Sequence, residues 1–507
     1  MPVELNACVE LLDRWVEKGD GDRPAVVCQS RTLSYADMLA ETQRVAAGLR
    51  VLGVQPEQRV ALVLLDSVEY VSAFLGALRI GAIPVPINPL LPLRDVAVIA
   101  ADARARVALI SCERVDGDGI RELKAAAPEL STVISTGTDW DDAFPALGSE
   151  LAAAATPYAS WDESPGFWLC TSGSTGQPKL AMHRHIDLLS PAYTYAREVL
   201  DIGQPDICYS VGPAFHAYGL GNSMSFPFSV GARAVLEPTR PPTPKLVAEL
   251  MRAHRPTLFF CIPTFYAALL AADLPDDTFA SVRLAVSAAE ALPPETYHRF
   301  RERFGVQILD GIGSTEVPHI FISNRPGDGA RAGTSGIPVG GYEVRLVDDA
   351  GSEVAAGEAG HLLVSGDSMA TGYWCRSEQN RKSFLGGWMR TGDMCQRTED
   401  GFYVYLGRSD DMLRVGGEWV SPTEVEAVLI EHPSVLEAAV VGVRDDSGVT
   451  RPVAWVVAAP GSQAPTADGL EEHCRGRLAG YKRPRRYEFV ESLPKTATGK
   501  IQRFRLR

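Results

Sequence analysis

Short apolar runs alternate with longer amphipathic segments through much of the first three hundred residues. The apolar run 59–65 is followed by a helical pattern over 68–80 and by a second apolar run at 106–110. The alternation returns farther along, in apolar runs at 207–211, 257–261, 282–286 and 307–309. Strands separated by helices are typical of a mostly parallel sheet covered by helices on both faces. The loops that follow such strands gather at one edge of the sheet, where ligands bind.

A further apolar run, 166–170, opens into a loop of glycines and hydroxyl side chains that ends in a lysine. The loop comprises Thr171, Ser172, Gly173, Ser174, Thr175, Gly176, Gln177, Pro178 and Lys179. Glycines let backbone N–H groups crowd around an anion because no Cβ is in the way. The hydroxyls add donors and Lys179 adds a positive charge, so the loop suits a polyphosphate. It is not a Walker A loop, which needs Gly-Lys directly before Ser or Thr. The alternative is a flexible Ser/Gly connector.

The texture changes from about residue 333. Segments 342–347 and 361–365 alternate apolar and polar residues between glycine-rich turns, which predicts an antiparallel sheet or a small barrel. A polar break at 408–411 precedes a capping box that begins at Ser421 and a small α+β pattern. We therefore predict an N-terminal domain over 1–407, a hinge at 408–411 and a C-terminal domain over 412–507. Residues 112–160 look loop-like and are expected to form a surface segment.

Size and charge exclude several functions. A chain of 507 residues is too long for one core. Its 49 basic and 63 acidic residues give a net charge of −14, which argues against a nucleic-acid groove. Nine cysteines without a C-x-x-C pair indicate reduced thiols rather than zinc or disulfides. The first twenty residues favour an amphipathic helix over a signal peptide, and no apolar run is of membrane-spanning length, so a cytoplasmic protein is expected.

Four short motifs contain residues that could bind a nucleoside triphosphate. Thr315 could donate to the α-phosphate, and Glu316 could ligate Mg²⁺, which prefers oxygen ligands. Asp393, expected in a turn between extended segments, could accept both ribose hydroxyls, and Arg408 could reach ribose or phosphate. Lys500 lies in a glycine-flanked loop near the C-terminus. Each has a simpler interpretation: a solvated loop acid, a turn aspartate, a surface arginine and a basic tail.

Together these motifs resemble the adenylate-forming superfamily of acyl- and aryl-CoA ligases, luciferases and adenylation domains. They occur in the family's order and cover most of the chain, as segments 171–179, 314–316, 391–393, 407–411 and 494–500. The resemblance implies a large α/β domain of parallel sheets with a small β-barrel, and a mobile α+β domain behind it. ATP, Mg²⁺ held by Glu316, and coenzyme A as co-substrate are implied too. The implied nucleotide contacts are Thr171, Ser172, Gly173, Ser174, Thr175, Gly176, Lys179, Ala289, Glu290, Asp310, Gly311, Ile312, Thr315, Asp393, Arg408 and Lys500.

The resemblance also implies that the small domain moves between two half-reactions. Lys500 would bridge the acid's carboxylate and the α-phosphate during adenylation, and Asp410 would be the pivot. Rotation would then withdraw Lys500 and bring Gly416, Gly417 and Glu418 in to line a pantetheine tunnel. One lysine at the acyl phosphate helps the first step but would block the incoming thiol, and two glycines let backbone pass close to a ligand.

Two segments resemble the benzoate-CoA ligase branch: 310–316 with His319 behind it, and 216–222. An aryl carboxylic acid is therefore the expected substrate. The implied pocket is lined by His216, Ala217, Tyr218, Gly311, Ile312 and His319. His216 departs from that branch, which carries an apolar aromatic residue there. If it faces the pocket, it could bond a ring hydroxyl or amino group, which favours a substituted benzoate or a bulkier cyclic acid.

Three functions remain open on the sequence. The first is an aryl-CoA ligase acting on a small carboxylic acid and CoA. The second is a stand-alone enzyme that loads a carrier protein's phosphopantetheine arm. The third is a non-enzymatic nucleotide-binding or scaffold protein, against which Lys500 and Glu316 argue; a luciferase-type oxidation is not favoured. No nucleic acid or membrane partner is expected, and a homodimer is one expected assembly.

Overall fold

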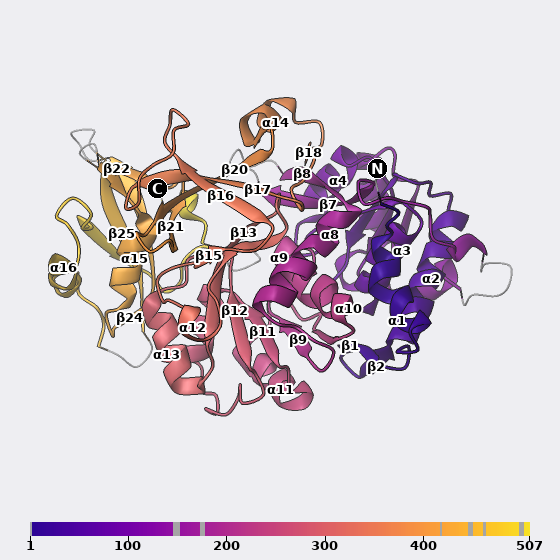
Figure 1. Cartoon of the computed structure of the whole chain (residues 1–507), viewed down its shortest axis with the longest axis horizontal. Helices are drawn as coiled ribbons and strands as arrows, with labels where there is room; N and C mark the ends of the chain where they lie inside the picture. The colour runs from indigo at the N-terminus through magenta and orange to yellow at the C-terminus, as the bar shows by residue number, and fades with distance from the viewer. Residues whose placement is uncertain are drawn as a thin grey trace.

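The structure is a computed structural model that describes residues 3–145, 153–172, 178–415, 418–444, 450–459, 463–495 and 501–506. The chain runs from its N-terminal part on one side of the molecule to its C-terminal part on the other (Figure 1). Within the described residues, no helix is long and apolar enough to span a membrane.

A nine-stranded sheet occupies the middle of the molecule (Figure 1). Its order is β15-β14-β13-β12-β11-β9-β10-β1-β2; it is parallel from β13 to β1 and antiparallel at both ends. The strands are β1 (Pro24–Cys28), β2 (Arg31–Ser34), β9 (Ile207–Ser210), β10 (Arg233–Leu236), β11 (Leu258–Cys261), β12 (Leu284–Ser287), β13 (Ile308–Ser314), β14 (His319–Ser323) and β15 (Ile337–Pro338). The predicted parallel sheet is confirmed. The loop expected after residue 309 is wrong, because β14 pairs with β13 and extends it to Ser314.

A second, four-stranded parallel sheet has the order β4-β3-β5-β6. Its strands are β3 (Arg59–Val63), β4 (Ile83–Pro86), β5 (Ala105–Ile110) and β6 (Thr132–Ser135). The interpretation of 112–160 as a loop-like surface segment is wrong. That segment contains α5 (Gly117–Ala126), β6 and α6 (Thr138–Ala143). A four-residue edge strand carries too little apolar pattern to stand out, although Ile134 and Ser135 are buried.

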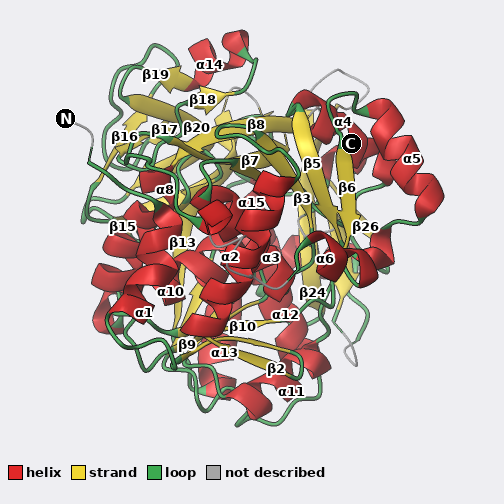
Figure 2. Ribbon diagram, turned by 90° about the vertical axis from the view of Figure 1, so that its right-hand side faces the viewer, coloured by secondary structure: helices red, strands yellow, loops and turns green. Residues whose placement is uncertain are grey.

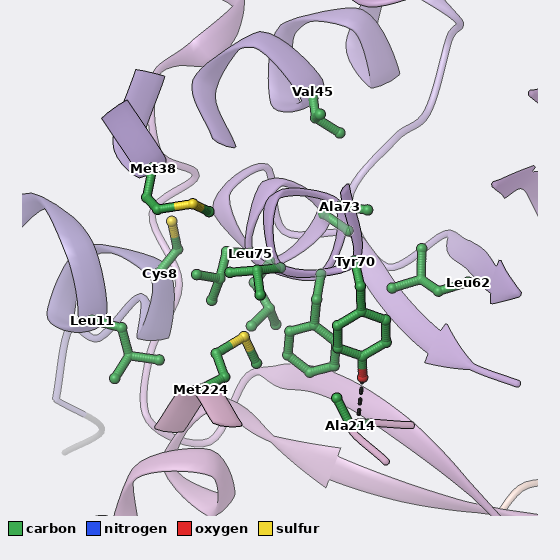
Figure 3. Close-up of a cluster of buried hydrophobic side chains, with 14 of the residues drawn as sticks. Cys8, Leu11, Met38, Val45, Leu62, Tyr70, Ala73, Leu75, Ala214 and Met224 are labelled. Carbon is green, nitrogen blue, oxygen red and sulfur yellow. Dashed lines mark hydrogen bonds between the residues drawn. The ribbon is translucent and has the colours of Figure 1, made fainter. Parts of the chain in front are cut away.

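Two helices, α2 (Tyr35–Val51) and α3 (Val68–Arg79), lie between the two sheets (Figure 2). Ser34 and Ser67 cap their N-termini by accepting from backbone N–H groups, as such residues do. Side chains of α2 and α3 form an apolar cluster with Val60 and Leu62 of β3. Ala61 and Val63 point to the other side of the strand and are buried there, so β3 is covered on both faces. Figure 3 shows the cluster, where Tyr70 donates to the Ala214 carbonyl at 2.6 Å.

Further helices cover the remaining faces. On the nine-stranded sheet, α11, α12 and α13 pack against side chains of β9, β11 and β12. Besides the helices named above, the first 304 residues contain η1 (Val9–Asp13), α1 (Arg14–Glu17), α4 (Leu93–Asp102), α8 (His185–Pro191), η4 (Ala192–Val199), α9 (Ala217–Leu220), η5 (Gly221–Ser225), α10 (Phe226–Val230), α11 (Pro244–His254), α12 (Pro263–Ala271) and α13 (Pro294–Phe304). The predicted N-terminal helix therefore spans residues 9–17.

Antiparallel strands lie at the top of the molecule in the view of Figure 1. The hairpin β7–β8 pairs with β18, and a five-stranded sheet is built on the path β16-β17-β20-β19, with β21 on β20. The elements are β7 (Pro165–Ser172), β8 (Pro178–Arg184), β16 (Tyr342–Val347), β17 (Ala359–Gly366), β18 (Gly372–Tyr373), α14 (Ser377–Ser383), β19 (Phe384–Leu385), β20 (Trp388–Arg397) and β21 (Tyr403–Arg408). The predicted change to antiparallel pairing is confirmed.

The described residues from Leu413 onward pack in two small apolar clusters around a three-stranded sheet, β24-β25-β26. The elements are β22 (Leu413–Val415), β23 (Glu418–Val420), α15 (Pro422–Ile430), β24 (Val435–Arg444), β25 (Thr450–Ala458), α16 (Ala467–Arg475), β26 (Arg486–Phe489) and η7 (Arg503–Arg505). Only half of the predicted capping box forms: Ser421 accepts from the Glu424 N–H, while the Glu424 carboxylate binds Lys482 at 2.7 Å. The hydroxyls of Ser421 and Thr423 both donate to the Leu406 carbonyl.

Candidate active site

The predicted phosphate loop closes the β7–β8 hairpin. Thr171 and Lys179 face each other across the two strands, so backbone pairing holds both ends of the loop. The ammonium of Lys179 lies 5.1 Å from the centre of the Tyr373 ring, a cation–π distance. Gly173, Ser174, Thr175 and Gly176, together with the Ser172 side chain, lie outside the described residues.

Tyr373 joins the hairpin to Glu316. Its hydroxyl donates to Glu316 Oε1 at 2.6 Å, and burial together with the Glu316 charge raises the pKa of Tyr373 above its usual range. The Glu316 side chain is buried, and the Glu316 carbonyl accepts from the Ala370 N–H at 2.8 Å. Tyr373 is not among the predicted site residues, because no spacing in the sequence connects it with residue 316.

Thr315 lies in a tight turn between β13 and β14. Ser314 accepts from the Val317 N–H at 2.9 Å, and His183 Nε2 lies 3.0 Å from the Thr315 carbonyl oxygen. Gly313 is required here, because a Cβ at this position would overlap the carbonyl oxygen of His319 on the paired strand. The hydroxyl of Thr315 is thus presented by a turn whose backbone is held on both sides.

Asp393 and Arg408 form an ion pair across two antiparallel strands. Arg408 Nη1 lies 3.0 Å from Asp393 Oδ1 and 2.8 Å from the Thr391 carbonyl, and the Tyr405 hydroxyl approaches the same carboxylate at 3.4 Å. The turn predicted around Asp393 is wrong: the residue lies inside β20 and pairs with Arg408 of β21. The strand continues because Gly392 takes a φ of +80°, which lets the backbone deviate without ending the ladder.

Three of the predicted nucleotide contacts lie on two neighbouring parallel strands, β12 and β13, or just beyond them. Ala289 is exposed just beyond β12 and has a φ of +75°, and Glu290 Oε2 accepts from the Thr264 N–H at 3.4 Å. Asp310 of β13 is buried, and the Ser335 hydroxyl donates to its Oδ2 at 2.9 Å. Burial raises the pKa of Asp310 to about 7. The edge of the sheet therefore holds a carboxyl group that titrates near neutrality.

The residues predicted to line the acid pocket come from the start of α9 and from the β13–β14 pair. His216 is half-buried at the start of α9, and Ala217 and Ile312 are buried. The Tyr218 hydroxyl donates to the carbonyls of Cys261 and Val286, at 3.2 and 3.0 Å, so its ring has one fixed orientation. Gly311 has no room for a Cβ beside Ile320.

His319 lies deeper than the other predicted pocket residues. Its side chain is buried among the rings of Tyr195, Tyr218 and Phe226, and its Nε2 is 2.8 Å from Asn222 Oδ1. Burial lowers the pKa of His319 to about 3, so the ring is neutral and donates through Nε2. It supports Tyr218 from behind.

The predicted hinge and tail are described only in part. Asp410 is exposed in the turn between β21 and β22. Lys500, Gly416, Gly417 and the Glu418 side chain lie outside the described residues. Both flanks of Lys500 are described: Lys495 bridges to Ile501, and Arg503 pairs with Glu426 of α15 at 2.7 Å.

The tail approaches the Asp393 site. Burial and Asp393 raise the pKa of the Tyr405 hydroxyl, whereas the charges of Arg408 and Arg503 act in the opposite direction. Arg503 is therefore within electrostatic reach of the same tyrosine that contacts Asp393.

Neither a cavity nor a cluster of metal-binding side chains adds a residue to this site. A cavity of about 450 Å³ opens beside the hairpin, between the start of β3, Trp168 and Trp374, and none of the predicted site residues lines it. Across the part of the chain that the structure describes, no three His, Cys, Asp or Glu side chains gather as a metal cluster. A single carboxylate still suits Mg²⁺, which is commonly held by one or two carboxylates plus substrate phosphates.

Two sequence-family models match this chain, and both describe enzymes that bind AMP. The family described as AMP-binding enzyme matches residues 12–374, and the AMP-binding enzyme C-terminal domain matches residues 424–500. The chain belongs to the AMP-binding enzyme family. It is an acid–thiol ligase of the AMP-forming kind, as the resemblance implied.

Individual relatives narrow the comparison. A benzoate–CoA ligase of Thauera aromatica is 44% identical over all of this chain and 96% of its own length. A 4-hydroxybenzoate–CoA/benzoate–CoA ligase of Rhodopseudomonas palustris is 41% identical, again over all of this chain and 95% of its own. The crystal structure of an anthranilate CoA ligase with anthranoyl-AMP matches with a TM-score of 0.94 and 39% identity, over 100% of this chain and 97% of that one.

Proposed function

We propose that the chain activates an aryl carboxylic acid with ATP and transfers the acyl group to coenzyme A. In the first step, a carboxylate oxygen attacks the α-phosphate, the bond to the β-phosphate's bridging oxygen breaks, and pyrophosphate leaves. In the second, the thiol of coenzyme A attacks the acyl carbonyl, AMP leaves and the thiol proton is released. The observation that carries the proposal is the contact of Lys179 and Glu316 with one residue, Tyr373.

The first step brings anions together, so its catalysis is mainly charge neutralisation and positioning. In the proposal, Thr171, Lys179 and the rest of the phosphate loop hold the β- and γ-phosphates, and Thr315 donates to the α-phosphate. Asp393 accepts the ribose hydroxyls, with Arg408 holding its carboxylate. Ala289, Glu290 and Asp310 flank the adenine, and Gly311 and Ile312 are further nucleotide contacts.

Glu316 is the proposed Mg²⁺ ligand. Its carboxylate is buried, keeps one oxygen beyond the Tyr373 hydrogen bond, and has no ion pair with any described residue. A buried carboxylate without a cation partner is costly, so the residues present fit a divalent cation. Bound there, Mg²⁺ would neutralise charge on the triphosphate.

Lys500 is the proposed bridge between the acid and the α-phosphate. Its support is the position of Arg503, three residues farther on, within reach of Tyr405 and of the hinge residue Asp411. Asp410 is the proposed pivot that withdraws the tail for the second step. Gly416, Gly417 and Glu418 are then proposed to line the pantetheine tunnel, and residues 1–407 and 412–507 to move as separate domains.

A substituted benzoate is the proposed acid. His216, Ala217, Tyr218, Gly311, Ile312 and His319 would surround it, and His216 would bond a ring hydroxyl or amino group. Relatives named for benzoate, 4-hydroxybenzoate and anthranilate support this class. Loading of a carrier protein and formation of a homodimer stay predictions of the sequence.

A pyrophosphate-release screen over benzoate and its hydroxy and amino derivatives tests the proposal. We expect release with aryl acids, loss of release in Lys500→Ala, and retained thioester formation from preformed acyl-AMP in that variant. Release that stays at background with every acid would overturn acid activation. Preference for plain benzoate over every derivative would reject only the role of His216. Acyl transfer to a carrier protein but not to free coenzyme A would overturn the acceptor.

A further inference from the structure

We propose that His183 is a positioning residue that ties the phosphate hairpin to the Thr315–Glu316 turn. The inference rests on the function proposed above for that turn. His183 lies on β8, four residues after Lys179, and its side chain is fully buried. Its ring stacks on Phe167 of the partner strand, with centroids 4.9 Å apart and planes 17° from parallel. The ring therefore has a fixed orientation.

Both ring nitrogens of His183 face acceptors. Nε2 lies 3.0 Å from the Thr315 carbonyl oxygen, and Nδ1 lies 3.3 Å from Asp187 Oδ2. A carbonyl and a carboxylate accept hydrogen bonds and do not donate them. Nε2 therefore acts as the donor to the Thr315 carbonyl, and Nδ1 is held beside the Asp187 carboxyl group.

Asp187 is itself held by several donors. It accepts from the Arg184 N–H at 2.9 Å and from Arg184 Nε at 3.0 Å, and Arg184 also pairs with Glu163 at 2.6 Å. These four groups, His183, Asp187, Arg184 and Glu163, form one connected network. His183 and Asp187 are buried, whereas Glu163 is exposed, and a bonded pair in a buried place is rigid. It fixes the Nε2–H of His183 at one place.

The consequence is a link between two parts of the site that are 132 residues apart in sequence. Strand β8 begins at the end of the phosphate loop, and the Thr315 carbonyl precedes Glu316 directly. A second link runs through the same strand, because Tyr373 pairs with Ala181 and donates to Glu316. His183 holds the backbone of the turn, and Tyr373 holds the Glu316 carboxylate. The Thr315 hydroxyl and the proposed Mg²⁺ ligand are therefore kept in a fixed position relative to the hairpin.

Three variants separate the two hydrogen bonds. His183→Gln keeps an N–H near the position of Nε2, His183→Asn keeps one near Nδ1, and His183→Phe keeps only the stacked ring. We expect the Phe and Asn variants to raise the KM for ATP about tenfold in pyrophosphate release, the effect of one lost hydrogen bond in a low-dielectric site. The Gln variant should stay within about twofold of the wild type. The KM for the acid and thioester formation from preformed acyl-AMP should not change.

The matched control is His473→Phe. His473 Nε2 also bonds a backbone carbonyl, that of Val428, at 2.9 Å, but it does so in the small domain. This variant should lower the thermal midpoint without changing the KM for ATP. If the role of His183 were merely structural, His183→Phe would give the same result as this control: a lower thermal midpoint and an unchanged KM for ATP.

Two outcomes would overturn the inference. One is an unchanged KM for ATP in folded His183→Phe and His183→Asn. The other is a Gln variant no better than the Asn variant, a comparison that also applies if the Phe variant does not fold. Thr315→Ala distinguishes the inference from the proposed function. An unchanged KM for ATP in Thr315→Ala contradicts the function of the turn itself, whereas a raised value there with an unaffected His183→Phe contradicts only the positioning role.

Discussion

The hydroxyl oxygen of Tyr373 lies 2.6 Å from Glu316 Oε1, and the same tyrosine ring carries the Lys179 ammonium 5.1 Å from its centre. One aromatic side chain thus orients both the carboxylate proposed for Mg²⁺ and the lysine proposed for the phosphates. The two residues belong to motifs more than a hundred residues apart, and neither motif contains the tyrosine.

Replacing Tyr373 by Phe should weaken the proposed Mg²⁺ site. The variant keeps the ring under Lys179 and loses the hydrogen bond to Glu316, and a hydrogen bond to a charged group contributes about 1.5–3 kcal/mol. We expect kcat/KM for pyrophosphate release to fall at least about tenfold, with partial recovery at high Mg²⁺. Steady-state kinetics over a Mg²⁺ series would measure both effects.

Tyr342→Phe is the control for this prediction. Tyr342 is also buried and its hydroxyl is 2.8 Å from Ser368 Oγ, but it contacts neither Glu316 nor Lys179 in any described interaction. It should lose stability without a change in Mg²⁺ dependence. Equal kinetic losses in the two variants would show that the hydroxyl of Tyr373 has no special part in the site.

Gly392→Ala should disturb the Asp393–Arg408 pair. A Cβ at residue 392 would lie 2.6 Å from Arg408 Nη2, and the arginine cannot move away without lengthening its bonds to Asp393 and to the Thr391 carbonyl. We expect the KM for ATP to rise several-fold and the free energy of unfolding to fall by about 1–2 kcal/mol, since an L residue also strains at this φ.

Gly386→Ala separates the two causes. Gly386 precedes the same strand, has a φ of +69°, and would place its Cβ in open space. This variant should show the strain in the unfolding free energy and leave the KM for ATP unchanged. If it impaired ATP binding as much as Gly392→Ala, contact with Arg408 would not be the cause.

Asp310 should make the stability of the protein fall as the pH rises. Burial raises the pKa of its carboxyl from 3.8 to about 7 in the folded protein. Between those values the native state binds more protons than the unfolded state, so the contribution of this group is complete below pH 3.8 and is lost up to about pH 7. The slope is at most about 1.4 kcal/mol per pH unit.

Asp310→Asn should remove that slope. The difference in unfolding free energy between wild type and variant, measured by urea denaturation from pH 4 to pH 8, should drift in favour of the variant and level off above pH 7. A difference that is constant over the whole range would show that Asp310 titrates alike in the folded and unfolded states.

His216→Phe should change which acid is preferred. An apolar ring cannot bond a hydroxyl or amino substituent, so kcat/KM for the best substituted benzoate should fall about tenfold or more, while that for plain benzoate holds or rises. The ratio of the two values is the measurement, and the KM for ATP is its control. An unchanged ratio would place His216 away from the ring substituent.

Much of the fold follows from local pattern. The alternation in 59–110 and 207–309 identified parallel strands, because a strand covered on both faces needs a continuous apolar run, as β3 has. Strand β6 and the extension of β13 were not predictable in this way. Each depends on a partner strand elsewhere in the chain, and its own residues carry little apolar signal.

The candidate site divides in the same manner. Lys179, Thr315, Glu316, Asp393 and Arg408 were predicted from the sequence because their chemistry is concentrated in short motifs of glycine, hydroxyl and charge. Tyr373 and His183 were not predicted, because an isolated tyrosine or histidine has no local signal. The pairing of β8 with β18 and β7 brings both residues to the site.

By itself, the sequence determined the class of sheet, the order of the motifs and the chemistry that they could perform, since period, charge and hydroxyl content are properties of neighbouring residues. The tertiary structure decided which motifs meet. Hydrogen bonds from His183 to Thr315 and from Tyr373 to Glu316 depend on distances across the fold, and these are set by packing among residues far apart in the chain.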